Sequence, residues 1–253
     1  MKRFILYTIL LVVSLVARGA EPMSAEHWEA GNKAYIEGDY NKAIAEYRAI
    51  LDGDEYSMKL YYNLANAYFK VGSIGKSILY YNKALRIAPS QEDIRHNLAI
   101  AEAQTKDRIV AIPEFFINRW LRTLRNTMSC GAWSLLSLLF FGVLLSFTLL
   151  FLLASRIRWR KVGFYGALFS LVMFVAVTLF AISSRNDILQ HEEAIVMGSA
   201  VSIKSSPDRS ATDLFVLHEG TKVRIIAEVD EWREIVIADG KKGWVEVKNI
   251  EQI

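Results

Sequence analysis

Two long runs without a charged residue, 132–154 and 162–184, limit what this chain can fold into more than any other feature. Each run is long enough to cross a hydrocarbon core of about 30 Å at about 1.5 Å per helical residue. On a membrane-insertion scale, their Leu, Ile, Phe and Val side chains contribute roughly 5–9 and 4–7 kcal/mol in favour of insertion. We therefore predict two transmembrane helices over these ranges, in preference to a helical hairpin buried in a globular domain.

The stretch between the two runs, ASRIRWRKVG, is strongly basic and contains no acid. Each cation would cost about 2.5–3.5 kcal/mol at mid-bilayer, so the loop 155–161 must leave the membrane on one face. Short basic loops stay in the cytoplasm, which places both soluble flanks outside it. Three arginines ahead of the first run argue against this orientation, but the N-terminal charges agree with it. The topology residues are Arg156, Arg158, Arg160 and Lys161.

Residues 1–20 have the layout of a secretory signal peptide. Lys2 and Arg3 precede an uncharged run, and small residues follow at Gly19 and Ala20, as at a cleavage site. An uncleaved N-terminal anchor is the alternative, and both send the next segment out of the cytoplasm. We expect a membrane protein with two spans after signal cleavage and both soluble domains outside the cytoplasm. The single cysteine, Cys130, allows no intrachain disulfide.

Residues 24–108 contain an internal repeat. The segment GNKAYIEGDYNKAIAEYRAIL aligns with ANAYFKVGSIGKSILYYNKAL, and equivalent residues are 34 apart. Small residues (Gly31, Ala65, Ala43, Ser77) and two tyrosines (Tyr47, Tyr81) recur at matching places. A third copy begins at Asn97. This pattern resembles the tetratricopeptide repeat, so we predict an all-α solenoid. A helix from Glu92 to about Arg108, capped by Ser90 and Asp93, would close it.

The inner faces of such repeats form a groove for a peptide. Asn side chains there would bind the peptide backbone, and aromatic rings would pack its side chains. The alternative is that these residues only follow the repeat consensus and fill the superhelix. The candidate groove residues are Asn32, Tyr35, Tyr62, Asn66, Phe69 and His96.

Residues 109–131 read as an amphipathic linker next to the membrane. After Pro113, Phe116 and Leu124 recur at helical spacing with Trp120 between them, and arginines occupy the opposite side. This pattern is typical of a helix lying among lipid head groups, and a subunit-contact helix is the alternative. Membrane lipid is accordingly an expected partner. The membrane-surface residues are Arg119, Trp120, Arg122 and Arg125.

Residues 194–253 change to an alternating pattern of five short strands, with turns at Pro207, Gly220 and Asp239-Gly240. The pattern resembles a bacterial SH3-like small barrel. We expect Trp232 and Trp244 to belong to its core, because the acidic and tyrosine residues of a proline-peptide groove are missing. Such modules elsewhere bind peptides or cell-wall material.

The predicted fold class is therefore a multidomain membrane protein: an all-α tetratricopeptide-repeat solenoid, two transmembrane helices and an all-β SH3-like small barrel. This order, with the segments IPEFF and DLFVLHEGTKV, resembles the BatE family of the Bacteroides aerotolerance operon along essentially the whole chain. The resemblance implies a component of a bacterial inner membrane, with two spans after signal cleavage and both soluble domains in the periplasm. It also implies a place beside a MoxR-type ATPase and von Willebrand factor A membrane proteins, with a role in envelope integrity or oxidative-stress tolerance. It implies no catalytic residues.

The sequence indicates binding rather than catalysis. The four histidines fall in different segments, without metal-ligand spacing or a phosphate-binding loop, so we expect no catalytic, cofactor-binding or metal residues. A net charge of +3 is too small to favour a nucleic-acid partner. We predict a non-enzymatic scaffold that binds protein partners through its repeats, with the barrel as an accessory. The alternative is a receptor that binds murein or glycan, a cell-wall ligand, through the barrel.

Overall fold

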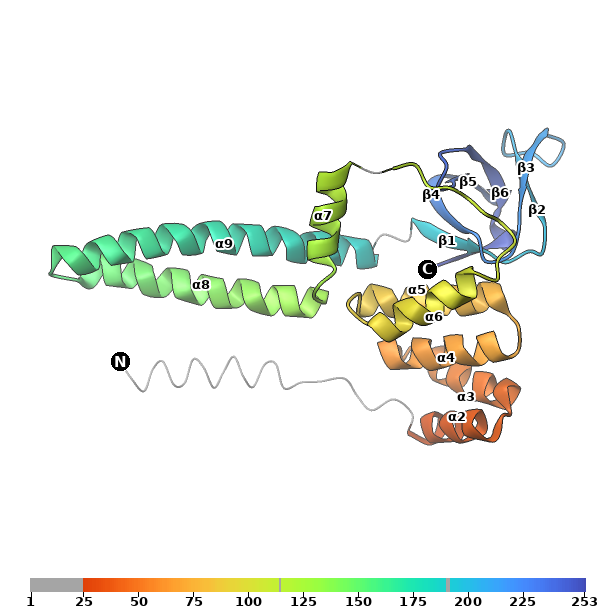
Figure 1. Cartoon of the computed structure of the whole chain (residues 1–253), viewed down its shortest axis with the longest axis horizontal. Coiled ribbons are helices and arrows are strands. Elements are labelled where there is room, and N and C mark those ends of the chain that lie inside the picture. Colours follow the sequence, from red (N-terminus) through yellow and green to blue (C-terminus); the bar gives the residue numbers. More distant parts are fainter. Residues whose placement is uncertain (1–24, 114, 190–191) are drawn as a thin grey trace. The chain divides into compact units, whose positions relative to one another are not determined.

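The computed structural model of the chain describes residues 25–113, 115–189 and 192–253 (Figure 1). The predicted signal peptide, residues 1–20, lies outside the described residues. The chain divides into two compact units between Tyr56 and Ser57.

The first unit is a pair of helices, α2 (Ala25–Glu37) and α3 (Tyr40–Asp52). Asp39 caps α3 by accepting a hydrogen bond from the Lys42 amide at 3.1 Å. A Cβ atom on Gly31 would lie 2.6 Å from the Tyr47 ring, so only glycine lets the helices approach this closely. Tyr47 is 1% exposed and fills the space between the helices, as the repeat pattern predicted.

The second unit begins with helices α4 (Met58–Lys70), α5 (Ile74–Ile87) and α6 (Glu92–Glu102). Gly72 ends α4 with φ of 79°, and Gly38 ends α2 with φ of 83°, so the two repeats share a left-handed turn that favours glycine. The predicted small residues of this repeat, Ala65 and Ser77, are fully buried. These equivalences confirm the helical repeat.

The closing helix is shorter than predicted. It ends at Glu102 because the Thr105 hydroxyl donates to the Glu102 carbonyl at 2.8 Å and Arg108 to the Ala103 carbonyl at 3.0 Å. Its N-cap residue is Gln91, and no side chain caps its first turn, so the predicted cap by Ser90 and Asp93 is wrong.

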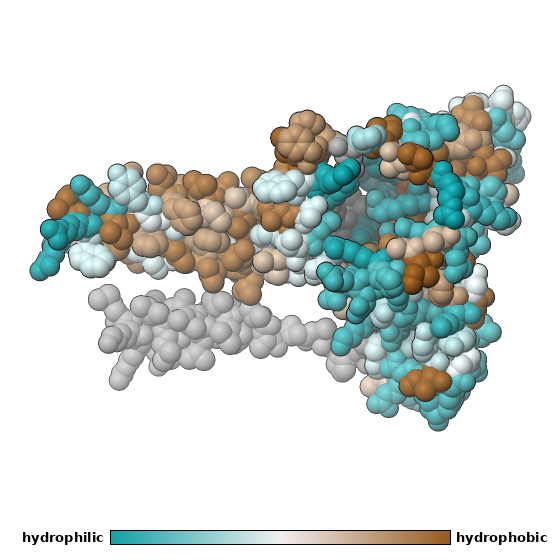
Figure 2. All heavy atoms as spheres, viewed as in Figure 1, coloured by the Kyte–Doolittle hydropathy of each residue, from teal (hydrophilic) through white to brown (hydrophobic). Residues whose placement is uncertain are grey.

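Three further helices follow: α7 (Phe116–Arg125), α8 (Cys130–Leu153) and α9 (Ile157–Leu189). The helices α8 and α9 pack side by side as an apolar hairpin, which is brown along its length in Figure 2. Leu138, Leu145 and Phe169 are 61%, 49% and 65% exposed. A helix pair that is apolar on its outer surface needs an apolar surrounding, so the two helices suggest membrane insertion.

The hairpin is held by close packing and polar contacts. A Cβ atom on Gly163 would lie 2.5 Å from the Phe151 backbone nitrogen, so the chains pass each other at a glycine. The hydroxyls of Ser137 and Thr178 lie 2.7 Å apart across the hairpin. Because α9 begins at Ile157, three of the predicted topology cations, Arg158, Arg160 and Lys161, lie in its first turns.

The C-terminal part of the second unit is an antiparallel sheet of seven strands in the order β3-β2-β6-β5-β4-β1-β7. Asp239-Gly240 forms the predicted turn between two of them, with Gly240 at φ of 87°. The strands are β1 (Glu193–Val196), β2 (Val201–Lys204), β3 (Asp213–Leu217), β4 (Lys222–Val229), β5 (Trp232–Val236), β6 (Lys242–Glu246) and β7 (Ile250–Gln252).

The core of this sheet is aliphatic. Ile203, Ile235 and Val245 are fully buried at its centre. Trp232 and Trp244 are only half-buried and lie outside this core, so the expectation that they fill it is wrong. The physical reason is register: Gly243 and Val245 face inward on β6, which turns Trp244 outward.

Candidate functional site

A polar network joins the three repeat helices of the second unit. The Tyr81 hydroxyl of α5 donates to Oδ1 of Asn66 on α4 at 2.5 Å. Asn97 of α6 donates through Nδ2 to the same Asn66 oxygen at 3.2 Å and to the Tyr62 hydroxyl at 3.0 Å. The structure thus brings Tyr62 and Asn66 together, and it adds Asn97, which was not among the predicted groove residues. The third-copy register of Asn97 was the signal for it.

The first unit repeats the central bond of this network. Its Tyr47 hydroxyl donates to Oδ1 of Asn32 at 2.8 Å, 34 residues before the equivalent pair. Tyr35 packs edge-on against Tyr40, with ring centroids 5.3 Å apart. The amide oxygens of both predicted asparagines therefore hold a tyrosine of their own repeat.

The remaining predicted groove residues differ in exposure. Phe69 is half-buried and packs against the repeat core. His96 is exposed on α6, and Ile100, one turn later, is 42% exposed. Tyr62 is half-buried, with its ring centroid 6.1 Å from that of Tyr81. The groups that α4 and α6 present to solvent here are thus the His96 imidazole, the Ile100 side chain and part of the Tyr62 ring.

The barrel is bound to the residues that follow α6 through Asp107. Oδ2 of Asp107 accepts from the His218 amide at 2.7 Å and from the Thr221 hydroxyl at 2.6 Å, and its Oδ1 lies 2.7 Å from Nδ1 of His218. Burial by itself would raise the pKa of Asp107, but the hydrogen bonds from Thr221 and His218 outweigh it and lower that pKa. The ionised carboxylate therefore stabilises the contact.

The barrel also packs on α5. Glu219 accepts a hydrogen bond from the Gly75 amide in the first turn of α5 at 2.8 Å. Ile195 and Ile253 of the barrel are buried in the same apolar cluster as Ile78 and Leu79 of α5. This contact could not be predicted from sequence patterns, because the residues are more than a hundred positions apart.

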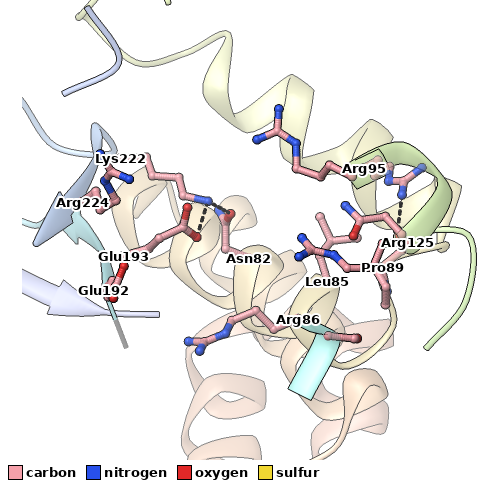
Figure 3. Close-up of a pocket in the computed structure, with 13 residues that line it drawn as sticks. Asn82, Leu85, Arg86, Pro89, Arg95, Arg125, Glu192, Glu193, Lys222 and Arg224 are labelled. Carbon is pink, nitrogen blue, oxygen red and sulfur yellow. Dashed lines mark hydrogen bonds and ion pairs between the residues drawn. The ribbon is translucent and has the colours of Figure 1, made fainter. Parts of the chain in front are cut away.

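A cavity of about 450 Å³ lies beside this contact, between α5, α6, α7, the end of α9 and strands β1 and β4. Figure 3 shows Lys222 and Arg224 on one side of it, Arg95 and Arg125 on the other, and Arg86 of α5 between them. Lys222 is 2.7 Å from Glu193 and 3.2 Å from Oδ1 of Asn82. The described lining residues hold six cations and two carboxylates.

The predicted membrane-surface residues separate into two groups. Trp120 is 63% exposed, and Arg119 is also exposed. Arg122 and Arg125 instead line the cavity, and Arg125 donates to the Ser183 hydroxyl of α9 at 2.8 Å. All four predicted topology residues are exposed at the turn of the hairpin: Arg156, Arg158, Arg160 and Lys161.

The outward face of β5 and β6 carries two indoles and two carboxylates. In the strand register Trp232 lies opposite Glu246 and Glu234 lies opposite Trp244. All four side chains alternate with inward-facing residues, so they share one face. Both indoles are half-buried, and Glu246 is paired with Arg209 and Lys248. The exposed part of an indole can stack on a sugar ring, and a carboxylate beside it can accept hydrogen bonds from the sugar hydroxyls.

Among the described residues, no three His, Cys, Asp or Glu side chains are placed to hold one metal ion. Cys130 is half-buried at the start of α8, and its Sγ lies 3.8 Å from the Ala181 carbonyl oxygen. This position is typical of a small side chain that packs between helices.

Comparisons with known families match two parts of the chain. Residues 59–91 match the tetratricopeptide repeat, and residues 199–251 match the bacterial SH3 domain. No curated protein matches the chain. The first match suggests a protein-interaction scaffold and the second suggests binding in the cell envelope, and both are typically non-catalytic modules.

Proposed function

We propose that this chain is a non-enzymatic scaffold of a bacterial inner membrane that binds protein partners through its repeat helices in the periplasm. The observation that carries the proposal is the polar network in which Asn97 of α6 donates to Tyr62 and Asn66 of α4. Tyr62 is half-buried, and α6 also presents the exposed side chains of His96 and Ile100. Aromatic and aliphatic anchors around fixed amides suit an extended or helical peptide segment.

The barrel leaves this face to a partner. Its hydrogen bonds to the repeat helices are made with Gly75, Asn82 and Arg86 of α5. On α4 and α6, the side chains of Tyr62, Asn66 and Asn97 bond to one another or to Tyr81 of α5, and none of these bonds involves the barrel. We infer that the barrel braces the repeats and that the partner contacts the α4–α6 face.

The resemblance of the whole chain to the BatE family supports a more specific assignment. We propose that the partners are membrane proteins with von Willebrand factor A domains and that the assembly serves envelope stress tolerance. The tetratricopeptide match supports a protein partner, and the two apolar helices support a place beside other membrane proteins.

The second candidate function is an envelope receptor in which the barrel binds murein or glycan. The outward face with Trp232, Trp244, Glu234 and Glu246 favours it, because both indoles are half-buried and lie outside the aliphatic core of the barrel.

Two matched variants of the full chain separate these functions. The double variant His96→Ala/Ile100→Ser removes two groups that face solvent on one side of α6. A change of both Tyr62 and Asn66 would be less clear, because Tyr81, which donates to Asn66, is only 2% exposed and would lose its acceptor. The barrel variant is Trp232→Ala/Trp244→Ala. Gln91→Ala/Gln104→Ala, at exposed positions flanking α6, is the control.

The measurement is quantitative co-purification of cross-linked partners from intact membranes, together with sedimentation on purified cell wall. We expect the α6 variant to lower partner recovery about tenfold or more, since an anchor residue commonly contributes about 2 kcal/mol, and the control to have no effect. Full partner recovery by the α6 variant, with loss of wall binding by the barrel variant, would favour the receptor instead.

A further inference from the structure

We propose that the cavity between α5, α7, α9 and β4 binds the phosphate head group of an anionic phospholipid. The inference rests on membrane insertion of α8 and α9, and it is independent of the repeat face. The cavity has a volume of about 450 Å³, which lies in the roughly 300–1,000 Å³ range of small-molecule sites.

The charge of the cavity selects an anion. Six basic side chains, Arg86, Arg95, Arg122, Arg125, Lys222 and Arg224, line it beside two carboxylates, Glu192 and Glu193. The described lining residues thus have a formal charge of +4. Guanidinium groups match phosphate oxygens in a two-pronged geometry, and several of them around one space favour phosphate over a lone carboxylate.

Neutral acceptors hold two of these guanidinium groups in place. Arg95 donates to the Pro89 carbonyl, and Arg125 donates to the Ser183 hydroxyl. A neutral acceptor orients an arginine without cancelling its charge. In Figure 3, Arg95 and Arg125 lie across the cavity from Lys222 and Arg224, so cations from different elements face one space.

The neighbouring surface supplies a place for an acyl chain. A second cavity of about 590 Å³ shares Arg122 and Arg125 with the first and is otherwise lined by Leu121 of α7 and Leu179 and Phe180 of α9, with Asn118 and Ser183. A free phosphate has no apolar part that could fill this second cavity. A lipid would place its phosphate among the arginines and its chain between α7 and α9.

The position relative to the bilayer agrees with this occupant. Ser184 lines the cationic cavity and lies within three residues of Asn186, where the apolar stretch of α9 ends. The exposed rings of Phe116 and Trp120 on α7 are typical of the interfacial layer. Basic pockets beside membrane helices in other proteins bind anionic lipid head groups.

The test uses the full chain, purified in detergent and delipidated. Phosphatidylglycerol and phosphatidylcholine are added in equal amounts, and retained lipid is counted by native mass spectrometry. The variant is Arg95→Gln/Arg224→Gln, because both side chains are exposed and their replacement should leave the fold intact. The control is Lys241→Gln/Lys248→Gln, whose side chains are 65% and 68% exposed outside the cavity.

We expect the unmodified chain and the control to retain phosphatidylglycerol over phosphatidylcholine, and the cavity variant to retain about tenfold less of it. Arg95→Lys/Arg224→Lys should keep much of the retention, because it keeps both positive charges. An unchanged circular dichroism spectrum of the Gln variant excludes a folding defect. Equal retention by the cavity variant and the control would overturn the proposal. Displacement of the lipid by glycerol phosphate at equal concentration would also overturn it, because the occupant would then be a free phosphate.

Discussion

Asp107 joins two parts of the second unit that are far apart in sequence. Its carboxylate receives the His218 amide and the Thr221 hydroxyl, and its side chain is 14% exposed. Hydrogen bonds to a charged acceptor are about twice as strong as bonds between neutral groups. Because the pKa of Asp107 is lowered in the fold, ionisation and docking of the barrel stabilise each other.

The first prediction concerns the pH dependence of this contact. The stabilisation should be fully present above about pH 4, the ordinary range of an Asp carboxyl, and should be lost as the pH falls through the lower pKa of the folded state. Asp107→Asn should reduce the free energy that stabilises this contact by about 1–3 kcal/mol at pH 7, since one amide oxygen must replace two carboxylate oxygens. Amide hydrogen exchange over residues 218–221 measures the effect. Unchanged exchange in the variant at pH 7 would contradict it, and Asp208→Asn, at an exposed turn, is the control.

Single residues also show where the sequence was sufficient. Tyr47 and Tyr81 were predicted to fill the gaps between helices from their 34-residue spacing alone, and both are buried. The same spacing could not show that Asn32 and Asn66 accept from these tyrosines, because that bond depends on how the helices cross. Trp232 and Trp244 were misplaced for a similar reason: the sheet register, rather than hydrophobicity, turns them outward.

At the scale of elements, α5 depends on the barrel for its N-terminus. Its N-cap residue, Ser73, makes no capping hydrogen bond through its side chain, and Glu219 supplies an acceptor to the Gly75 amide instead. A carboxylate near the start of a helix also interacts favourably with the helix dipole. The helix and the barrel therefore stabilise each other.

The second prediction follows from this capping contact. Glu219→Ala should weaken the first turn of α5 by about 1 kcal/mol, within the range of lost caps, and Glu219→Gln should lose less because it keeps an acceptor. The rate of hydrogen exchange of the amides of residues 74–78 should rise most in Glu219→Ala and less in Glu219→Gln. Glu234→Ala, on the outward face of β5, serves as the control. A rise of the same size in the control would mean that the effect is not local to α5.

The elements that the sequence predicted are those with a long periodic signal. The apolar runs yielded α8 and α9, the repeat spacing yielded α2 to α6, and alternation yielded β2 to β6. Strand β1 was missed because its three buried residues are consecutive rather than alternating, and β7 was missed because it has only three residues. The cationic cavity could not be predicted, since its walls come from segments between residues 82 and 224 that meet only in the fold.

At the scale of the molecule, the second unit is continuous from its repeat helices to its barrel. The chain after α6 follows the barrel, where the Ile112 amide donates to the Ala238 carbonyl at 3.0 Å and Ile109 packs on the barrel core. The barrel therefore also has a structural role for the repeats, because removing residues 194–253 would expose Ile78 and Leu79. Since α4 to α6 and the barrel are joined, they must lie on the same side of a membrane.

The last prediction tests that common side and its identity. In a Cys130→Ala background, single cysteines replace exposed Lys70 on α4, Ser206 after β2 and Ser155 at the hairpin turn. Basic residues at the turn favour the cytoplasm, so an impermeant maleimide should label positions 70 and 206 on intact spheroplasts. Position 155 should react only after the membrane is opened, and the background protein should show little labelling throughout. Labelling of position 155 alone on intact spheroplasts would show the opposite orientation. Labelling of only one of positions 70 and 206 would contradict the contact between repeats and barrel, because two joined domains cannot face opposite compartments.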